Sequence, residues 1–186
     1  MNSAVLDACV LYSASLRDCL LHLADVGLFE PHWSEEIQNE WTYHLLQNRP
    51  KLRERLERTC REMDRHFPDG LVRGYESITS TLTLPDPKDR HVLAAAIYAR
   101  AECIVTFNLK DFPNTVLQPY GIEALSPDEF VFRLIQREPP LVLLAIKNLR
   151  QELKKPPKTV AEYLAALEKQ GLPKTVAFLR EHEEEV

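Results

Sequence analysis

The stretch P-D-P-K-D-R-H-V-L-A-A-A-I-Y-A-R-A-E-C-I-V-T, residues 85–106, decides the fold class that we expect. Asp86 followed by Pro87 is a typical helix start, and the apolar run after it predicts a helix to about Ala101. The short apolar segment 103–106 then predicts a buried strand. Because a helix that leads directly into a buried strand is typical of βαβ units, we expect a parallel sheet.

Strands and helices are expected to alternate on both sides of this stretch. Residues 3–7 predict a first strand, and apolar residues recur at helical spacing over 12–26. The other predicted elements are an extended piece at 28–33, helices at 34–46 and 50–66, a loop at 67–83, and a helix opened by a capping box at Ser126 and Glu129. The sequence therefore predicts an α/β fold.

The chain changes character from Glu138 onwards, where proline pairs at 139–140 and 156–157 punctuate helical segments. A second capping box, formed by Thr159 and Glu162, opens a further helix. Apolar residues recur at helical spacing, so each helix needs a partner surface on the rest of the chain or on a second subunit. In the first of these helices the expected apolar stripe is Leu141, Leu144, Ala145 and Leu149.

Length and composition predict one globular domain with a helical extension. The chain has 186 residues, of which 45% are apolar, which is enough for a core without disulfides or a structural metal. We place the domain at 1–136 and the extension at 137–186. The sequence contains no apolar run of 18 residues and no secretion signal, so we expect a cytoplasmic protein without membrane contact.

The four cysteines predict a reduced protein rather than a zinc site. They show no C-x-x-C spacing, and Cys9 and Cys103 lie in apolar runs that we interpret as strand-like. We therefore expect reduced core residues rather than disulfides or zinc ligands.

The distribution of charge leaves one question open. A net charge of −5 argues against a protein that coats nucleic acid through overall positive charge. The segment from Arg49 to Arg65, however, contains seven basic and four acidic residues, which gives a local charge of +3. Pairs at i,i+4 explain part of this as a solvated helix. The alternative is an RNA-binding face formed by Arg58, Arg61 and Arg65.

Asp7 is the sharpest indication of a functional site. It stands inside the apolar run A-V-L-D-A-C-V-L at 4–11. A buried ionised carboxylate is strongly destabilising unless it is paired or binds a metal. Its position therefore requires a partner of opposite charge or a bound metal ion.

Other acidic residues can meet Asp7 at one edge of the sheet. Asp7 ends the first strand, while Asn108 and Asp111 follow a later one. Ligands collect outside the carboxyl ends of parallel strands, and Glu40 and Asp89 can project to the same edge. Hard oxygen ligands without His or Cys suit Mg²⁺ or Mn²⁺, the ions of phosphodiester chemistry.

Four short motifs occur in a fixed order: D-A-C at 7–9, S-x-x-x-x-x-E from Ser34 to Glu40, P-D-P-K-D-R-H-V-L-A-A-A at 85–96, and T-F-N-L-K-D-F at 106–112. Together they resemble PIN-domain ribonucleases, particularly the VapC-type toxins of bacterial toxin-antitoxin pairs. The resemblance covers about residues 1–135 and implies a three-layer α/β/α fold with a central parallel sheet. The helical extension is similar to a C-terminal segment found on a subset of such toxins.

The resemblance implies that four carboxylates bind the metal and carry catalysis: Asp7, Glu40, Asp89 and Asp111. Four further residues would support these carboxylates or replace one of them as a ligand: Asp86, Asn108, Thr106 and Ser34. Many PIN domains carry Asp where this chain has Asn108. Whether Asn108 or Asp111 faces the metal therefore stays open, and we favour Asp111.

Each of these residues also has an ordinary structural interpretation. Asp86 is a routine helix cap, and Asp89 in the first helical turn interacts favourably with the helix dipole. Glu40 could be a surface residue of its helix, and Asp111 could cap a turn. We expect His91, two residues after Asp89, to point away from the site.

The leading hypothesis is a Mg²⁺-dependent endoribonuclease that acts as a toxin, forms a homodimer and binds RNA and an antitoxin protein. The alternative is a PIN-like protein-interaction module without catalytic activity. Two other acidic α/β sites are excluded. A HAD-type phosphatase needs a second Asp where Cys9 stands, and a receiver domain needs an acidic pair near the first strand.

Overall fold

The computed structural model describes residues 3–153 and 158–186, so the predicted break at Pro156 and Pro157 lies outside the described residues. No helix within these two ranges is long and apolar enough to cross a membrane. The chain divides into two compact units, each made of two segments. We call them the sheet unit, Met1–Tyr12 with Glu30–Leu125, and the helical unit, Ser13–Phe29 with Ser126–Val186.

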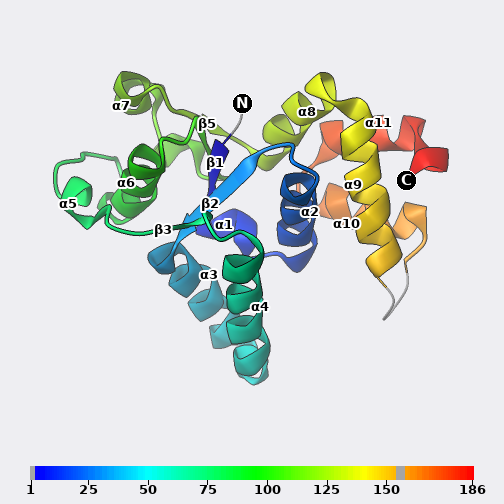
Figure 1. Ribbon diagram of the computed structural model, residues 1–186, viewed down its shortest axis with the longest axis horizontal. Helices are drawn as coiled ribbons and strands as arrows, with labels where there is room; N and C mark the ends of the chain where they lie inside the picture. The colour runs from blue at the N-terminus through cyan, green and yellow to red at the C-terminus, as the bar shows by residue number, and fades with distance from the viewer. Residues whose placement is uncertain (1–2, 154–157) are drawn as a thin grey trace. The chain divides into compact units, whose positions relative to one another are not determined.

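The sheet unit is built on five parallel strands in the order β3-β2-β1-β4-β5. Figure 1 labels β1, β2, β3 and β5 of this sheet. The strands are β1 (Ser3–Leu6), β2 (Glu30–Ser34), β3 (Leu71–Val72), β4 (Cys103–Val105) and β5 (Glu123–Leu125). In the centre, Val5 pairs with His32 on one side and with Ile104 on the other. The strand order therefore reverses between β1 and β4, which makes this point the expected place for a ligand site.

Helices of the sheet unit pack on these strands and on one another. The α-helices are α1 (Ala8–Leu11), α3 (Glu35–Asn48), α4 (Arg53–His66), α5 (Glu76–Thr79), α6 (Arg90–Ala99) and α7 (Asn114–Leu117). Four 3₁₀ turns, η1 (Pro50–Leu52), η2 (Pro87–Asp89), η3 (Leu109–Asp111) and η4 (Gln118–Tyr120), join them. Helix α6 contacts β1 to β4, and α3 packs between β2 and α4.

Local sequence explains where the two helices nearest the site begin. The Ser34 hydroxyl accepts a hydrogen bond from Ile37 N at 3.1 Å and so caps α3. The Asp86 carboxylate accepts from Lys88 N at 2.9 Å and caps η2, which leads into α6. These caps fix the entry points of the two helical segments that carry Glu40 and Asp89.

The helical unit joins an early helix to four late ones. Its elements are α2 (Ala14–Asp25), α8 (Pro127–Arg137), α9 (Pro139–Glu152), α10 (Val160–Lys169), α11 (Pro173–Glu181) and the 3₁₀ turn η5 (Glu183–Glu185). Helix α9 packs against α2 and α8, and α11 packs against α8 and α10. The partner surface that the extension needs is therefore supplied largely by α2 and α8.

The predicted three-layer α/β/α fold with C-terminal helices is confirmed. Two predicted details are wrong. The segment 67–83, expected to be a loop, contains β3 and α5. In α9, Leu141 and Leu144 are exposed, and Val142 and Ile146 take the buried positions. A shift of one or two residues in helical phase explains the second error, because apolar residues occupy several consecutive positions there.

The domain boundary after residue 136 stays a prediction. The helical unit includes α2 and α8, both of which begin before that boundary. The capping box of Thr159 and Glu162 is confirmed at the start of α10. At the start of α8, Ser126 accepts from Glu129 N at 3.2 Å, while the Glu129 carboxylate pairs with Arg133 and Lys174.

Candidate functional site

A pocket of about 550 Å³ lies at the carboxyl ends of β1 and β4. This volume is in the range of small-molecule sites. The residues that line it come from the β1–α1 junction, α3, η2 and the loop after β4: Asp7, Ala8, Cys9, Tyr12, Glu40, Trp41, His44, Gln47, Asn48, Asp89 and Asn108. Three of the four predicted catalytic carboxylates, Asp7, Glu40 and Asp89, thus line one pocket.

Asp7 is held by hydrogen bonds at the base of this pocket. It is only 6% exposed, and one carboxylate oxygen accepts from Ala8 N at 2.6 Å. The other accepts from the Thr106 hydroxyl at 2.6 Å and from Cys9 Sγ at 3.1 Å. Burial and then the charge of Asp7 raise the pKa of the Cys9 thiol to about 12, so this thiol remains a hydrogen-bond donor.

Asp89 lies near several other carboxylates. Its pKa is raised to about 6, with burial as the largest cause. The other cause is the charge of four carboxylates around it: Asp7, Asp86, Asp111 and Glu40. The fold therefore brings all the predicted acidic residues within electrostatic reach of one carboxyl group.

Glu40 has a partner that sequence analysis missed. His91 is only 3% exposed, and its Nε2 lies 3.0 Å from Glu40 Oε1, while Nδ1 lies 3.8 Å from a Glu36 oxygen. The expectation that His91 points away from the site is therefore wrong. Although burial lowers the His91 pKa, its hydrogen bond to Glu40 and the charges of Glu40, Glu36 and Asp7 raise the pKa above its usual value.

Asn108 and Asp111, the two alternative candidates for a metal ligand, occupy different places. Asn108 lines the pocket, and its backbone N donates to the Thr106 hydroxyl at 2.9 Å. Asp111 ends η3 and is half-buried outside the pocket lining, within electrostatic reach of Asp89. Ser34 caps α3 as described above, and its support of the carboxylates stays a prediction.

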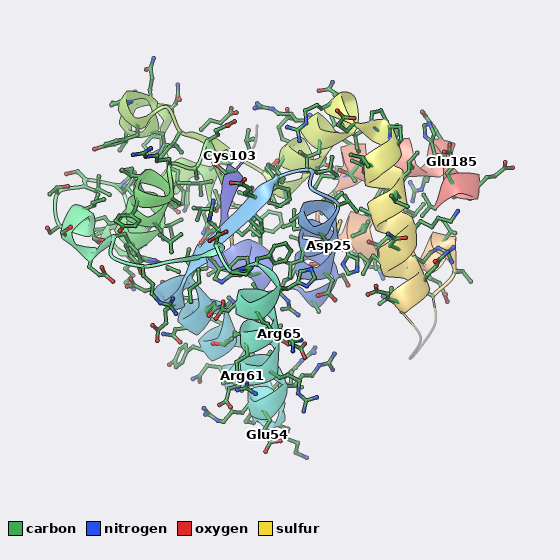
Figure 2. The ribbon with its side chains drawn as sticks, viewed as in Figure 1. Asp25, Glu54, Arg61, Arg65, Cys103 and Glu185 are labelled. Carbon is green, nitrogen blue, oxygen red and sulfur yellow. The ribbon has the colours of Figure 1, made fainter. Side chains whose placement is uncertain are left out.

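The predicted RNA-binding arginines lie outside the pocket. Arg58, Arg61 and Arg65 are exposed on α4, and Figure 2 shows Arg61 and Arg65 along this helix, with Glu54 near its start. Leu56 and Met63 form the buried face of α4. By helical phase the three arginines fall on the opposite face, and Arg61 lines a second hollow between α3 and α4.

The donor chemistry of the pocket fits a hard divalent cation. Within residues 3–153 and 158–186, no group of three His, Cys, Asp or Glu side chains stands in an arrangement that would by itself hold a metal ion. The pocket nonetheless offers carboxylate oxygens and the amide of Asn108, while His44 and the Cys9 thiol also line it. Oxygen donors with excess negative charge suit Mg²⁺ or Mn²⁺.

Sequence analysis also missed the end of the pocket formed by neutral side chains. Tyr12, His44, Gln47 and Asn48 line it. The available signal was helical spacing, because positions four, seven and eight residues after Glu40 share its face of α3.

Comparison with known families agrees with this geometry. The family model for the PIN domain matches residues 3–110, which is more than half of the chain. The chain belongs to the PIN-domain family. A second family model, the VapC50 C-terminal domain, matches residues 127–181. The PIN match contains every element that lines the pocket, and the second match lies wholly within the helical unit.

A related protein gives a narrower comparison. The chain is 50% identical over 68 residues to a Mycobacterium tuberculosis (strain ATCC 25618 / H37Rv) protein named "Putative ribonuclease VapC50". The match covers 34% of this chain and 40% of that protein's length. No solved structure matches the chain.

Proposed function

We propose that this PIN-domain protein is an endoribonuclease that depends on Mg²⁺ or Mn²⁺. The convergence of Asp7, Glu40 and Asp89 in one pocket, at the point where the strand order reverses, carries the proposal. The name of the partly matching relative, which contains the word ribonuclease, supports RNA as the substrate.

Four carboxylates would hold the metal: Asp7, Glu40, Asp89 and Asp111. A bound divalent ion would supply an activated water and offset negative charge on the attacked phosphate. Its positive charge would also relieve the repulsion that, in addition to burial, raises the pKa of Asp89. The negative charge of the carboxylates would thus bind the cation, and the cation would in turn offset the charge of the phosphate.

Neighbouring side chains hold the carboxylates in place. The Thr106 hydroxyl and the Cys9 thiol donate to Asp7, and His91 lies in hydrogen-bond contact with Glu40. Such contacts limit the rotamers of the ligands, which a preorganised site needs. We propose that Thr106 and His91 act as positioning residues.

We further propose that the exposed arginines of α4 contact the RNA backbone. Arg58, Arg61 and Arg65 share one face and would neutralise phosphates without reading sequence. The proposal includes a role as the toxin of a toxin-antitoxin pair in the cytoplasm, with a cognate antitoxin as partner and a homodimer as the active form.

The deciding experiment measures RNA cleavage by the purified protein with and without metal. Cleavage should require Mg²⁺ or Mn²⁺, stop with EDTA and return when either ion is added in excess; Ca²⁺ should support it poorly because of its looser geometry. Asp7→Asn, prepared in parallel, controls for contaminating nucleases. Cleavage by Asp7→Asn would contradict the mechanism, and no cleavage by either protein on diverse RNA would favour the interaction module.

A second measurement separates the two alternative ligands. Asn108→Ala and Asp111→Ala should be compared for Mn²⁺ affinity by isothermal titration calorimetry. We expect the larger decrease from Asp111→Ala, because it removes a full negative charge from the group around Asp89. A larger decrease from Asn108→Ala would instead assign the metal ligand to the residue that lines the pocket.

A further inference from the structure

The pocket extends well beyond its carboxylates along one face of α3. After Glu40, the lining residues of this helix are Trp41, His44, Gln47 and Asn48. Eight residues of α-helix span about 12 Å, at a rise of about 1.5 Å per residue. The pocket therefore has an acidic end at Glu40 and a neutral polar end at Asn48.

An aromatic side chain completes the neutral end. Tyr12 follows α1, lines the pocket and is 38% exposed. Because α1 packs against α3, Tyr12 belongs to the same part of the sheet unit as the polar residues of α3. Among the described residues, no hydrogen bond engages the Tyr12 hydroxyl or the Gln47 amide, so both groups are available to a ligand.

We propose that Tyr12, His44, Gln47 and Asn48 form a subsite for one nucleobase of the RNA substrate. The proposal rests on the proposed ribonuclease function, and it assigns base recognition to this neutral end. If the acidic end held a phosphate of the substrate with the aid of a metal ion, the attached nucleoside would lie near the pocket's other lining residues.

The chemistry of the neutral end suits a base better than a phosphate. Its lining contains no Lys or Arg, whereas phosphate contacts are made mainly by such cations. The Gln47 and Asn48 amides each offer a donor and an acceptor, the combination that reads a base edge. Within the described residues, the Asn48 amide makes one long contact, 3.5 Å from its nitrogen to His44 O. The Tyr12 ring supplies a stacking surface.

The test measures which base the enzyme prefers beside the cleaved bond. RNA with randomised positions is digested in Mg²⁺, and the cleavage sites are read by sequencing. Gln47→Ala combined with Asn48→Ala should reduce the preference between bases about 10-fold, as expected when a pair of hydrogen bonds to a base edge is removed. Asn39→Ala, an exposed amide on α3 that lines the other hollow, is the matched control and should change nothing.

Stacking is tested separately. Tyr12→Ala should raise KM about 10-fold, Tyr12→Phe should restore it, and Tyr120→Ala, an exposed tyrosine outside the pocket, should have no effect. Unchanged base preference in the amide double variant together with unchanged KM in Tyr12→Ala would overturn the subsite. A change in overall rate with unchanged preference would also overturn base recognition.

A binding experiment remains decisive if the protein cleaves no RNA. Adenosine, cytidine, guanosine and uridine, which lack phosphate, are titrated into the metal-free protein and followed by NMR. We expect shifts of the Gln47 and Asn48 side-chain amides, with at least one nucleoside bound about 3-fold more tightly than another, a modest ratio for one base edge. Absence of such shifts overturns the subsite, whereas shifts without any nuclease activity support it and refute only the proposed function.

Discussion

Asp7 in the sheet unit and Asp128 in the helical unit are buried to nearly the same extent, with exposed fractions of 6% and 7%. The two oxygens of Asp128 accept from Lys174 N at 3.0 Å and from Thr175 N at 2.9 Å, at the start of α11. Asp7 also accepts hydrogen bonds, but it faces a pocket that contains other carboxylates.

The difference shows that burial alone does not identify a functional carboxylate. Asp128 meets the positive end of a helix dipole, so its charge is offset within the protein. Asp7 lies among like charges, and its own charge contributes to the raised pKa of Asp89. We expect the charge of an acid that stabilises the fold to be offset by groups of the protein itself. An acid that binds a cation can instead stand among uncompensated negative charges, which the bound cation neutralises.

The largest expected effect is on activity. Asp7→Asn should reduce RNA cleavage by more than about 100-fold, beyond the roughly 10–100-fold typical of residues that only orient metal ligands. Its melting temperature should change little, because Asn has the same shape and one negative charge fewer relieves repulsion. Asp128→Asn should leave cleavage unchanged. Activity is measured as kcat/KM on one RNA. Equal losses in Asp7→Asn and Asp128→Asn would contradict the distinction between the two aspartates.

Removal of the hydroxyl that holds Asp7 should have the next largest effect. Thr106→Val preserves shape but removes the 2.6 Å hydrogen bond. We expect kcat/KM to fall about 10–100-fold, together with weaker Mn²⁺ affinity. Thr106→Ser should retain both. A Thr106→Val protein with wild-type metal affinity would show that this hydrogen bond serves only the fold.

Asp128→Ala should lower stability without affecting the site. Loss of the two hydrogen bonds to α11 should decrease the free energy of unfolding by about 1–2 kcal/mol, as for other helix caps. Urea unfolding followed by circular dichroism measures this change, with Glu181→Ala, an exposed acid of α11, as control. Equal stability of the two variants would mean that water replaces the Asp128 cap without loss.

The smallest effect concerns the exposed arginines. Exchange of Arg58, Arg61 and Arg65 for Glu should weaken RNA binding several-fold and make log Kd less dependent on log salt, by about one unit of slope for each phosphate that is no longer neutralised. Fluorescence anisotropy at several salt concentrations provides the slope. An unchanged slope would return α4 to the interpretation of an ordinary solvated helix.

Much of the fold followed from local signals, because caps and apolar periodicity are encoded in neighbouring residues. Asp86 and Thr159 were recognisable as caps from sequence. β3 and β5 were not predicted, since strands of two or three residues depend on pairing with distant strands rather than on their own pattern.

The site shows the same limit. Asp7 stood out because its sequence neighbours are apolar, but the contact of His91 with Glu40 joins two helices and leaves no local pattern. Asp89 ends a 3₁₀ turn, and α6 begins after it, so α-helical phase does not relate Asp89 to His91. Asp128 stands in the first turn of α8, and its partners, Lys174 and Thr175, lie far away in the sequence, so no local pattern indicates their contact.

The discontinuous composition of the helical unit sets an order of events during synthesis. α2 leaves the ribosome more than about 100 residues before α9, the helix that covers it. Protein synthesis adds about 5–20 residues per second. The apolar face of α2, with Leu16, Leu20 and Leu23, therefore lacks this partner for roughly 5–20 seconds. The nascent chain thus exposes an apolar helix face early, and α9 can cover it only after the C-terminal part of the chain has been synthesised.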